Sequence, residues 1–157
     1  MKITFLLTGK TEESWIKTGF EQYLVRLKHY CQLEVIEIPA LKQSGKLSAA
    51  EQNKAEGELQ LAKISPSDRL VLLDEKGKEF SSVGFSGWID KQQLAGHKRL
   101  VFLIGGPFGF SDKVYERANE KLSFSQMTFS HQMIRVIMAE QLYRAYTILK
   151  GEKYHHS

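Results

Sequence analysis

Three short segments of the chain combine residue types that can line a binding site for a flat polar ligand. They are Leu73 to Gly77, Gly105 to Gly109 and Ser123 to Phe129. Each follows or ends an apolar run typical of a buried strand, and in open α/β sheets ligands gather beyond the carboxyl ends of the strands. We therefore expect the three segments to line one pocket.

The glycine-rich segment has two readings. Gly105, Gly106 and Gly109 would let the backbone approach a ligand that a side chain would obstruct, but a tight turn between a strand and a helix explains them equally well. Pro107 removes an N–H from any phosphate cradle, and no Gly-Lys-Ser/Thr follows, which disfavours Walker-type ATP use. Only Gly9 follows the first apolar run, so a dinucleotide-binding turn is disfavoured as well.

The third segment interleaves hydroxyl groups with apolar side chains. This composition can hydrogen-bond and sandwich an adenine-like ring, although a buried strand end that leads into a helix would look the same. The residues concerned are Phe124, Ser125, Gln126, Met127, Thr128 and Phe129.

Acid–base candidates lie near the end of the chain. Tyr154, His155 and His156 offer a phenol and imidazoles that can stack on a base or handle a proton near neutral pH, whereas a frayed tail is the ordinary alternative. His131 and Arg135 lie one helical turn apart and share a face.

For two further pairs of charged residues, we expect structural and not catalytic roles. Glu140 and Arg144 have the spacing of an ion pair on a helix. Asp74 and Glu75 are adjacent in a strand end and point in different directions, which favours structural or solvent roles over a pair of catalytic acids.

The composition is that of one globular domain, which we place at residues 1–157. Hydrophobic residues make up 42% of the chain and charged residues 25%. Cys31 is the only cysteine, so an intrachain disulfide and a cysteine-rich zinc site are excluded, and a reducing cytoplasm fits best. No apolar run approaches the roughly 20 residues of a membrane span. The net charge of +4 favours polyanionic partners.

Apolar β-branched runs alternate with helical periodicity along the chain. This alternation predicts an α/β fold with a parallel sheet covered by helices. Thr11 is the expected N-cap of the first helix, and Ser48 with Glu51 forms a capping box that opens a polar, exposed second helix. The last helix is apolar on most of its circumference, which predicts cover on several sides. We expect strands at 3–7, 33–38, 69–73, 100–104 and 121–124, helices at 11–27, 48–64, 82–94 and 132–150, and a mobile loop at 40–46.

Ordered motifs through the whole chain resemble the ribosomal RNA large subunit methyltransferase H family, whose members are minimal SPOUT-class enzymes. The resemblance runs from the opening Met-Lys-Ile through Leu73-x-x-x-Gly77 and Phe102-x-Ile-Gly-Gly106-x-x-Gly109. It continues in Leu122-Ser-Phe-Ser-Gln-Met-Thr-Phe-Ser-His-Gln-Met-Ile-Arg135, in Glu140-Gln-Leu-Tyr-Arg-Ala-Tyr146 and in Gly151-Glu-Lys-Tyr-His155.

The resemblance implies a homodimer with a C-terminal trefoil knot that holds S-adenosylmethionine. With the composition, we expect a cytoplasmic protein with no metal and no membrane partner. It implies transfer of a methyl group to N3 of a pseudouridine in 23S rRNA within the ribosome. Cofactor contacts would fall at Leu73, Gly105 and the segment from Phe124 to Phe129. The catalytic or base-binding candidates are Tyr154, His155 and Arg135.

The sequence departs from the family pattern at two positions. Ser130 stands where proline is common, so a hydroxyl cap is expected to start the last helix. His156 stands where Lys or Arg is common, which weakens a phosphate contact.

Two alternative functions stay open beside this one. The alternatives are a SPOUT methyltransferase acting on tRNA and a non-catalytic RNA- or nucleotide-binding module.

Overall fold

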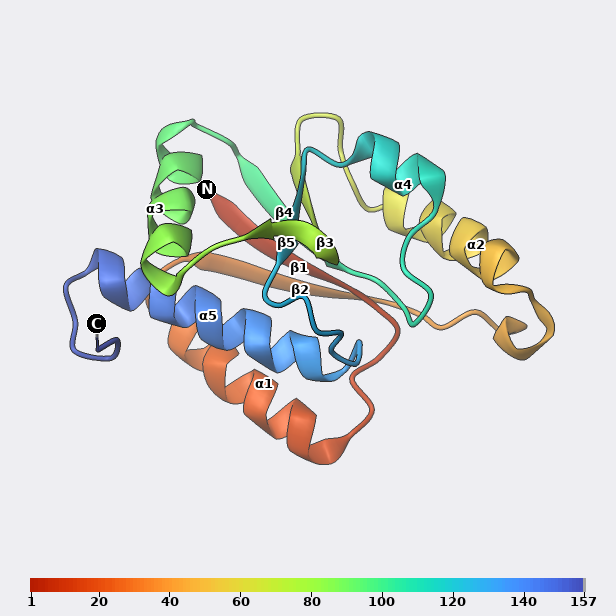
Figure 1. The fold of residues 1–157 in the computed structure, drawn as a ribbon, viewed down its shortest axis with the longest axis horizontal. Coiled ribbons are helices and arrows are strands. Elements are labelled where there is room, and N and C mark those ends of the chain that lie inside the picture. Colours follow the sequence, from red (N-terminus) through yellow and green to blue (C-terminus); the bar gives the residue numbers. More distant parts are fainter. Residues whose placement is uncertain (157) are drawn as a thin grey trace.

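Five parallel strands form the centre of the molecule (Figure 1). A computed structural model describes residues 1–156. The strands lie side by side in the order β2-β1-β4-β3-β5, and each neighbouring pair is parallel, which confirms the predicted α/β class. Their bounds are Lys2–Thr8 (β1), Gln32–Ile38 (β2), Arg69–Glu79 (β3), Arg99–Ile104 (β4) and Glu120–Ser123 (β5).

Helices cover both faces of the sheet, as Figure 1 shows. One face carries α1, α3 and α5, and the other carries α2 and α4. The helices are Ser14–Leu27 (α1), Ala49–Leu61 (α2), Ser82–Leu94 (α3), Asp112–Arg117 (α4) and Met133–Leu149 (α5), and a 3-10 turn, η1, spans Ser44–Lys46.

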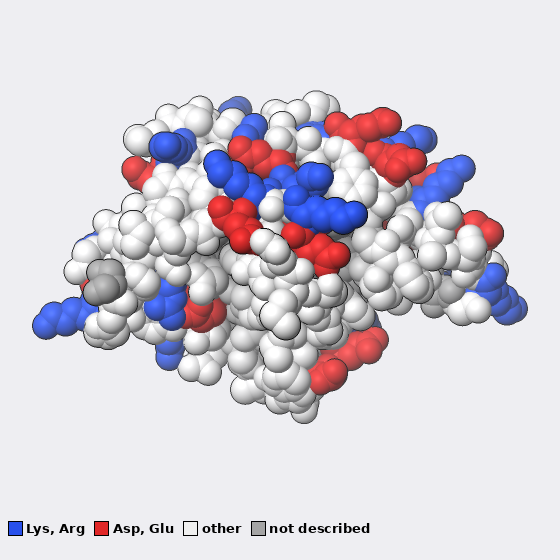
Figure 2. Space-filling view, in the orientation of Figure 1, with Lys and Arg blue, Asp and Glu red and all other residues white. Residues whose placement is uncertain are grey.

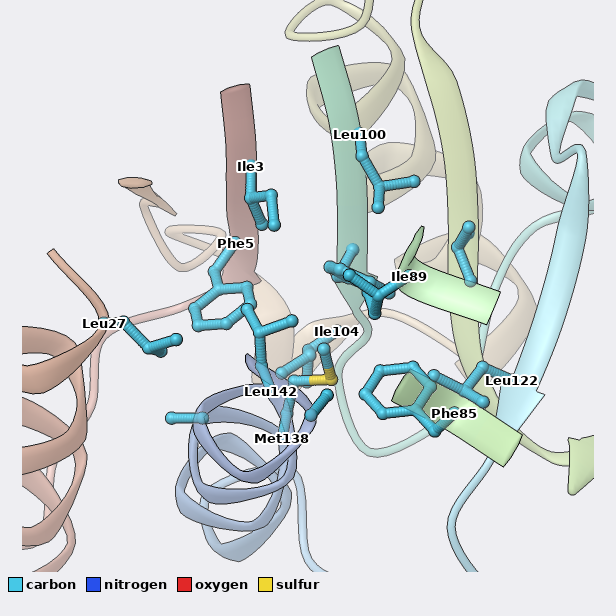
Figure 3. Close-up of a cluster of buried hydrophobic side chains, with 14 of the residues drawn as sticks. Ile3, Phe5, Leu27, Phe85, Ile89, Leu100, Ile104, Leu122, Met138 and Leu142 are labelled. Carbon is cyan, nitrogen blue, oxygen red and sulfur yellow. The ribbon is translucent and has the colours of Figure 1, made fainter. Parts of the chain in front are cut away.

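Alternation along each strand divides the apolar core into two parts. In β4, Leu100, Phe102 and Ile104 face α1, α3 and α5, whereas Val101 and Leu103 face α2 and α4. The first cluster is the larger, and Figure 3 shows how side chains of α5 reach the sheet within it. The near-continuous apolar runs of the central strands are therefore explained by burial on both faces.

The third strand extends past its predicted end at residue 73. Leu73 and Lys78 both pair with Leu122 of β5, so residues 74 to 77 leave the ladder before pairing resumes. Gly77 lies in this detour, where a Cβ would come within 2.6 Å of the Lys121 carbonyl carbon. Because backbone atoms cannot rotate away, only glycine fits there.

The helix starts agree in part with the N-caps predicted from the sequence. The Ser48 hydroxyl accepts a hydrogen bond from the Glu51 N–H, and the Ser130 hydroxyl accepts one from the Met133 N–H at the entry to α5, as expected. The expectation for Thr11 was wrong, because α1 begins at Ser14 and the Thr11 hydroxyl accepts from the Arg135 guanidinium instead. Helix α4 was not predicted.

Helix α2 is polar but, contrary to expectation, one side of it is buried. Gln52 and Glu56 are each 8% exposed and Gln60 is 1% exposed. These side chains bond to one another and to the sheet, since Gln52 donates to Glu56 and Gln60 donates to the Thr8 hydroxyl, each at 2.9 Å. Hydrogen bonding thus replaces apolar contact over part of this interface.

Within residues 1–156, no helix has both the length and the apolar character that crossing a membrane requires.

We predict that Leu142→Ala lowers the free energy of unfolding by about 2–5 kcal/mol, because Leu142 is fully buried in the larger cluster and its loss leaves a cavity. Leu94→Ala is the matched control, since Leu94 is 80% exposed and its removal should change stability by less than about 0.5 kcal/mol. Urea denaturation measures both. Equal effects of the two substitutions would contradict the assignment of α5 to the core.

Candidate functional site

The predicted pocket exists at the carboxyl edge of the sheet. Strands β4, β3 and β5 are neighbours, so the chain segments that leave their carboxyl ends meet. They enclose a cavity of about 710 Å³, a size that suits a small-molecule ligand. Residues 73–76, 104–110, 122–125 and 127–131, with Tyr115 and Ile134, line it.

The segment after β5 is held in shape by its own hydroxyl groups. The Ser123 hydroxyl donates to the Ser125 carbonyl at 2.8 Å, and the Ser125 hydroxyl accepts from the Met127 N–H at 2.9 Å. Thr128 donates to the Glu75 carboxylate, which ties this segment to the detour in β3. Phe124 packs edge-on against Phe85 of α3. The fixed loop presents pocket-lining groups at every position from 123 to 131 except Gln126.

The glycines of the second segment have neighbours or backbone angles within the protein that suit glycine. A Cβ on Gly105 would lie 2.9 Å from the Phe110 ring, and one on Gly106 would lie 3.0 Å from the Glu56 carboxylate. Gly109 has a φ of +79° and donates from its N–H to the Gly106 carbonyl at 3.3 Å. These contacts favour the tight-turn reading, although the turn forms one wall of the pocket.

Asp74 and Glu75 both line the pocket and hold partners from other segments. The Tyr115 hydroxyl donates to Asp74 at 2.7 Å, and the Lys76 N–H donates to the same carboxylate at 2.8 Å. Burial and this hydrogen bond raise the pKa of Tyr115 to about 12. Tyr115 lies on the unpredicted helix α4, and the Ser111 hydroxyl that caps this helix was the sequence signal that could have revealed it.

Arg135 follows the pocket-lining residue Ile134 on α5 and is fully buried. Its guanidinium donates to the Thr8 carbonyl at 3.0 Å, to the Thr11 hydroxyl at 2.8 Å and to the His131 carbonyl at 3.1 Å. Burial lowers its pKa, opposed by the charges of Glu37 and Glu12. Arg135 does not line the pocket, so its contacts are those of a residue that fixes the surrounding backbone.

The C-terminal residues fold back on α5 and do not line the pocket. The Tyr154 ring packs edge-on against Tyr143, and its hydroxyl donates to Glu140 at 3.0 Å. The Arg144 guanidinium lies over the same ring and also contacts His155 Nδ1 at 3.2 Å. Burial and hydrogen bonding raise the pKa of Tyr154, which keeps the phenol neutral.

The tail is far from the pocket of its own chain. Ile134 at the start of α5 lines the pocket, whereas the tail follows the end of that helix at Leu149. At 1.5 Å per residue, the intervening helix is roughly 22 Å long. One copy of the chain therefore does not bring Tyr154 and His155 to its cofactor-binding candidates.

Among residues 1–156, no cluster of three or more His, Cys, Asp or Glu side chains is arranged to hold a metal ion. A pocket beyond the carboxyl ends of neighbouring parallel strands, with mixed apolar and hydrogen-bonding walls, is typical of α/β proteins that bind a small organic ligand at the sheet edge.

Comparison with known proteins identifies the family to which this α/β protein belongs. Residues 1–155 match the family described as "Predicted SPOUT methyltransferase". The chain is 52% identical over 156 residues to "Ribosomal RNA large subunit methyltransferase H" of Parabacteroides distasonis, covering 99% of each chain. Proteins of the same name from Phocaeicola vulgatus and Cytophaga hutchinsonii are each 51% identical over 156 residues, covering 99% of this chain and 99% and 100% of theirs. The chain thus belongs to the SPOUT methyltransferase family.

We predict that Asp74→Asn lowers the pKa of Tyr115 from about 12 towards 10.0, because an amide does not oppose phenolate formation by charge. Ultraviolet titration of tyrosine ionisation measures this pKa, with Tyr115→Phe identifying the signal. The raised pKa means that the stabilising effect of neutral Tyr115 is present below pH 10 and is lost as the pH rises through about 12. An unchanged pKa in Asp74→Asn would attribute the shift to burial alone.

Proposed function

We propose that the protein transfers a methyl group from S-adenosylmethionine to N3 of a pseudouridine in 23S rRNA, acting on the ribosome in the cytoplasm. The observation that carries this proposal is the convergence of the three segments on one pocket in a chain that matches rRNA methyltransferases over its full length. A ribosomal substrate in turn accounts for a cytoplasmic location.

The residues present in the pocket fit S-adenosylmethionine. Leu73, Leu122 and Ile134 offer apolar contact to an adenine ring, while backbone groups of the loop after β5 are available to its polar edge. Asp74 and Glu75 bring negative charge to a cavity that would receive a positively charged sulfonium. The C-terminal trefoil knot implied by the family remains an expectation.

Catalysis in this site depends mainly on positioning. When bound, S-adenosylmethionine supplies an electrophilic methyl group for in-line displacement. The protein must hold the acceptor nitrogen in line with that group and exclude water. Arg135 contributes by fixing the start of α5, where His131 and Ile134 line the pocket, against the end of β1 and the loop after it.

We infer that the active site is completed by a second copy of the chain. The outer sides of α1 and α5 retain apolar groups, among which Trp15 is 58% exposed and Val25 is 59% exposed. In Figure 2, the lower part of the molecule over α1 and α5 is largely uncharged between charged groups at its margins. Antiparallel pairing of these helices between two copies would bring one tail to the pocket of the other chain.

We predict that Leu73→Ala weakens S-adenosylmethionine binding about tenfold, because the side chain's apolar contact with the ligand is lost. Isothermal titration calorimetry measures the affinity, and Leu94→Ala, at an exposed position, should leave it within about twofold. Binding by the parent without methylation of ribosomes, free subunits or tRNA would favour the non-catalytic module. Mapping the methylated nucleotide separates rRNA from tRNA as substrate.

We predict that a chain ending at Lys153 binds S-adenosylmethionine normally but methylates ribosomes about 10²-fold more slowly, since Tyr154 and His155 are lost while the pocket is intact. A chain ending at His155 is the control and should remain within threefold of the parent. Single-turnover methylation measures the rates. Full activity of the chain ending at Lys153 would contradict a role for the tail.

Mixing the chain that ends at Lys153 with Leu73→Ala tests the composite site. S-adenosylmethionine is kept well below saturation for Leu73→Ala, so that this variant is nearly inactive alone. In a mixed dimer, one site combines an intact pocket with an intact tail, so activity should exceed the sum of the two variants measured separately. A mixture that gives only this sum would show that each chain acts alone.

A further inference from the structure

A second, smaller cavity of about 120 Å³ adjoins the cofactor pocket. Gly106, Pro107 and His131 line both cavities, so they form the partition between them. The rest of the second cavity is formed by the loop after β1, by residues 39–41 after β2, by Gln52 and Glu56 of α2, and by Gln132. No residue proposed to contact the cofactor belongs to it.

The chemical feature of this cavity is a nearly buried carboxylate. Glu56 is 8% exposed, and its Oε1 accepts a hydrogen bond from Gln52 at 2.9 Å. Within residues 1–156, Oε2 has neither a hydrogen-bond donor nor a cationic partner. Because Glu56 lines the cavity, this oxygen is free to accept a hydrogen bond from a ligand that brings an N–H group.

Glu56 also lies close to the cofactor pocket. A Cβ on Gly106 would lie 3.0 Å from Oε2 and 3.2 Å from Oε1, so the carboxylate lies against the part of the partition that Gly106 forms. A flat ring placed against the carboxylate would thus have its N–H edge at the partition. The other titratable side chains around this cavity are Lys10, Glu12 and His131.

We propose that the second cavity receives the acceptor base, a uracil-type ring, and that the Glu56 carboxylate takes the proton of its ring N–H. This inference rests on the proposed methyltransferase function. The ring nitrogen forms the new N–C bond with its electron pair, the C–S bond of the sulfonium donor breaks with its pair left on sulfur, and the proton passes to Glu56. A cation and an anion are consumed, and neutral thioether, methylated base and carboxylic acid remain.

The test compares Glu56→Gln and Glu56→Asp in the full-length protein. Gln keeps the length of the side chain and its bond to Gln52 but cannot take a proton, whereas Asp keeps the carboxylate and loses the length. If Glu56 takes the proton, Glu56→Gln should lower the single-turnover rate at neutral pH about 10²-fold. Glu56→Asp should then retain more activity than Glu56→Gln. Glu58→Gln, an exposed glutamate on the same helix, should stay within twofold of the parent.

The pH dependence adds a readout that packing alone would not change. In Glu56→Gln, the base must lose its proton to solvent, so the rate should rise about tenfold per pH unit above neutrality and approach that of the parent. S-adenosylmethionine affinity, measured by calorimetry, should stay within twofold in all three variants, which also verifies that they fold.

Two results would overturn the assignment. One is a Glu56→Gln variant with nearly full activity at neutral pH, which would leave His131 as the acceptor at the partition. The other is greater activity in Glu56→Gln than in Glu56→Asp with no recovery at high pH, which would make Glu56 a packing residue. A parent protein that neither binds S-adenosylmethionine nor methylates rRNA would instead refute the proposed function itself.

Discussion

The arrangement of both cavities depends on one buried cation. Arg135 joins the loop after β1 to the start of α5 through two backbone carbonyls and the Thr11 hydroxyl, and within residues 1–156 no carboxylate lies at ion-pair distance from it. A buried charge held in this way is tolerable only while all of its hydrogen bonds are made. The loop and the helix start are consequently locked together, and His131 is fixed between the two cavities.

The sheet supplies the second condition for the site. Because β4, β3 and β5 are neighbours, three segments that are distant in sequence meet at one edge without any long loop. The detour in β3 then brings Asp74 and Glu75 to partners on α4 and on the loop after β5. The detour in β3 is therefore held by side chains of two other walls, which gives this part of the pocket a defined shape before any ligand binds.

The sequence was informative where the structure is apolar and much less so where it is polar. Strand positions and the three pocket segments followed from buried runs and from the rule that ligands bind at strand ends. Helix α2 was misjudged because a polar pattern normally means exposure, whereas Gln52, Glu56 and Gln60 are buried through hydrogen bonds that no periodicity reveals. The location of Glu56 beside Gly106 is likewise a product of tertiary packing.

Gly77 has a consequence for how this protein can change over evolutionary time. Both neighbouring residues of β5 present backbone atoms within 2.7 Å of any Cβ at this position, so even alanine would separate the two strands. Asp74, Glu75 and Lys76 lie in the same detour and already carry side chains. A substitution at Gly77 would therefore disturb the pairing of β3 with β5, whereas a substitution at Asp74 or Glu75 would remove one hydrogen bond of the pocket and leave that pairing in place.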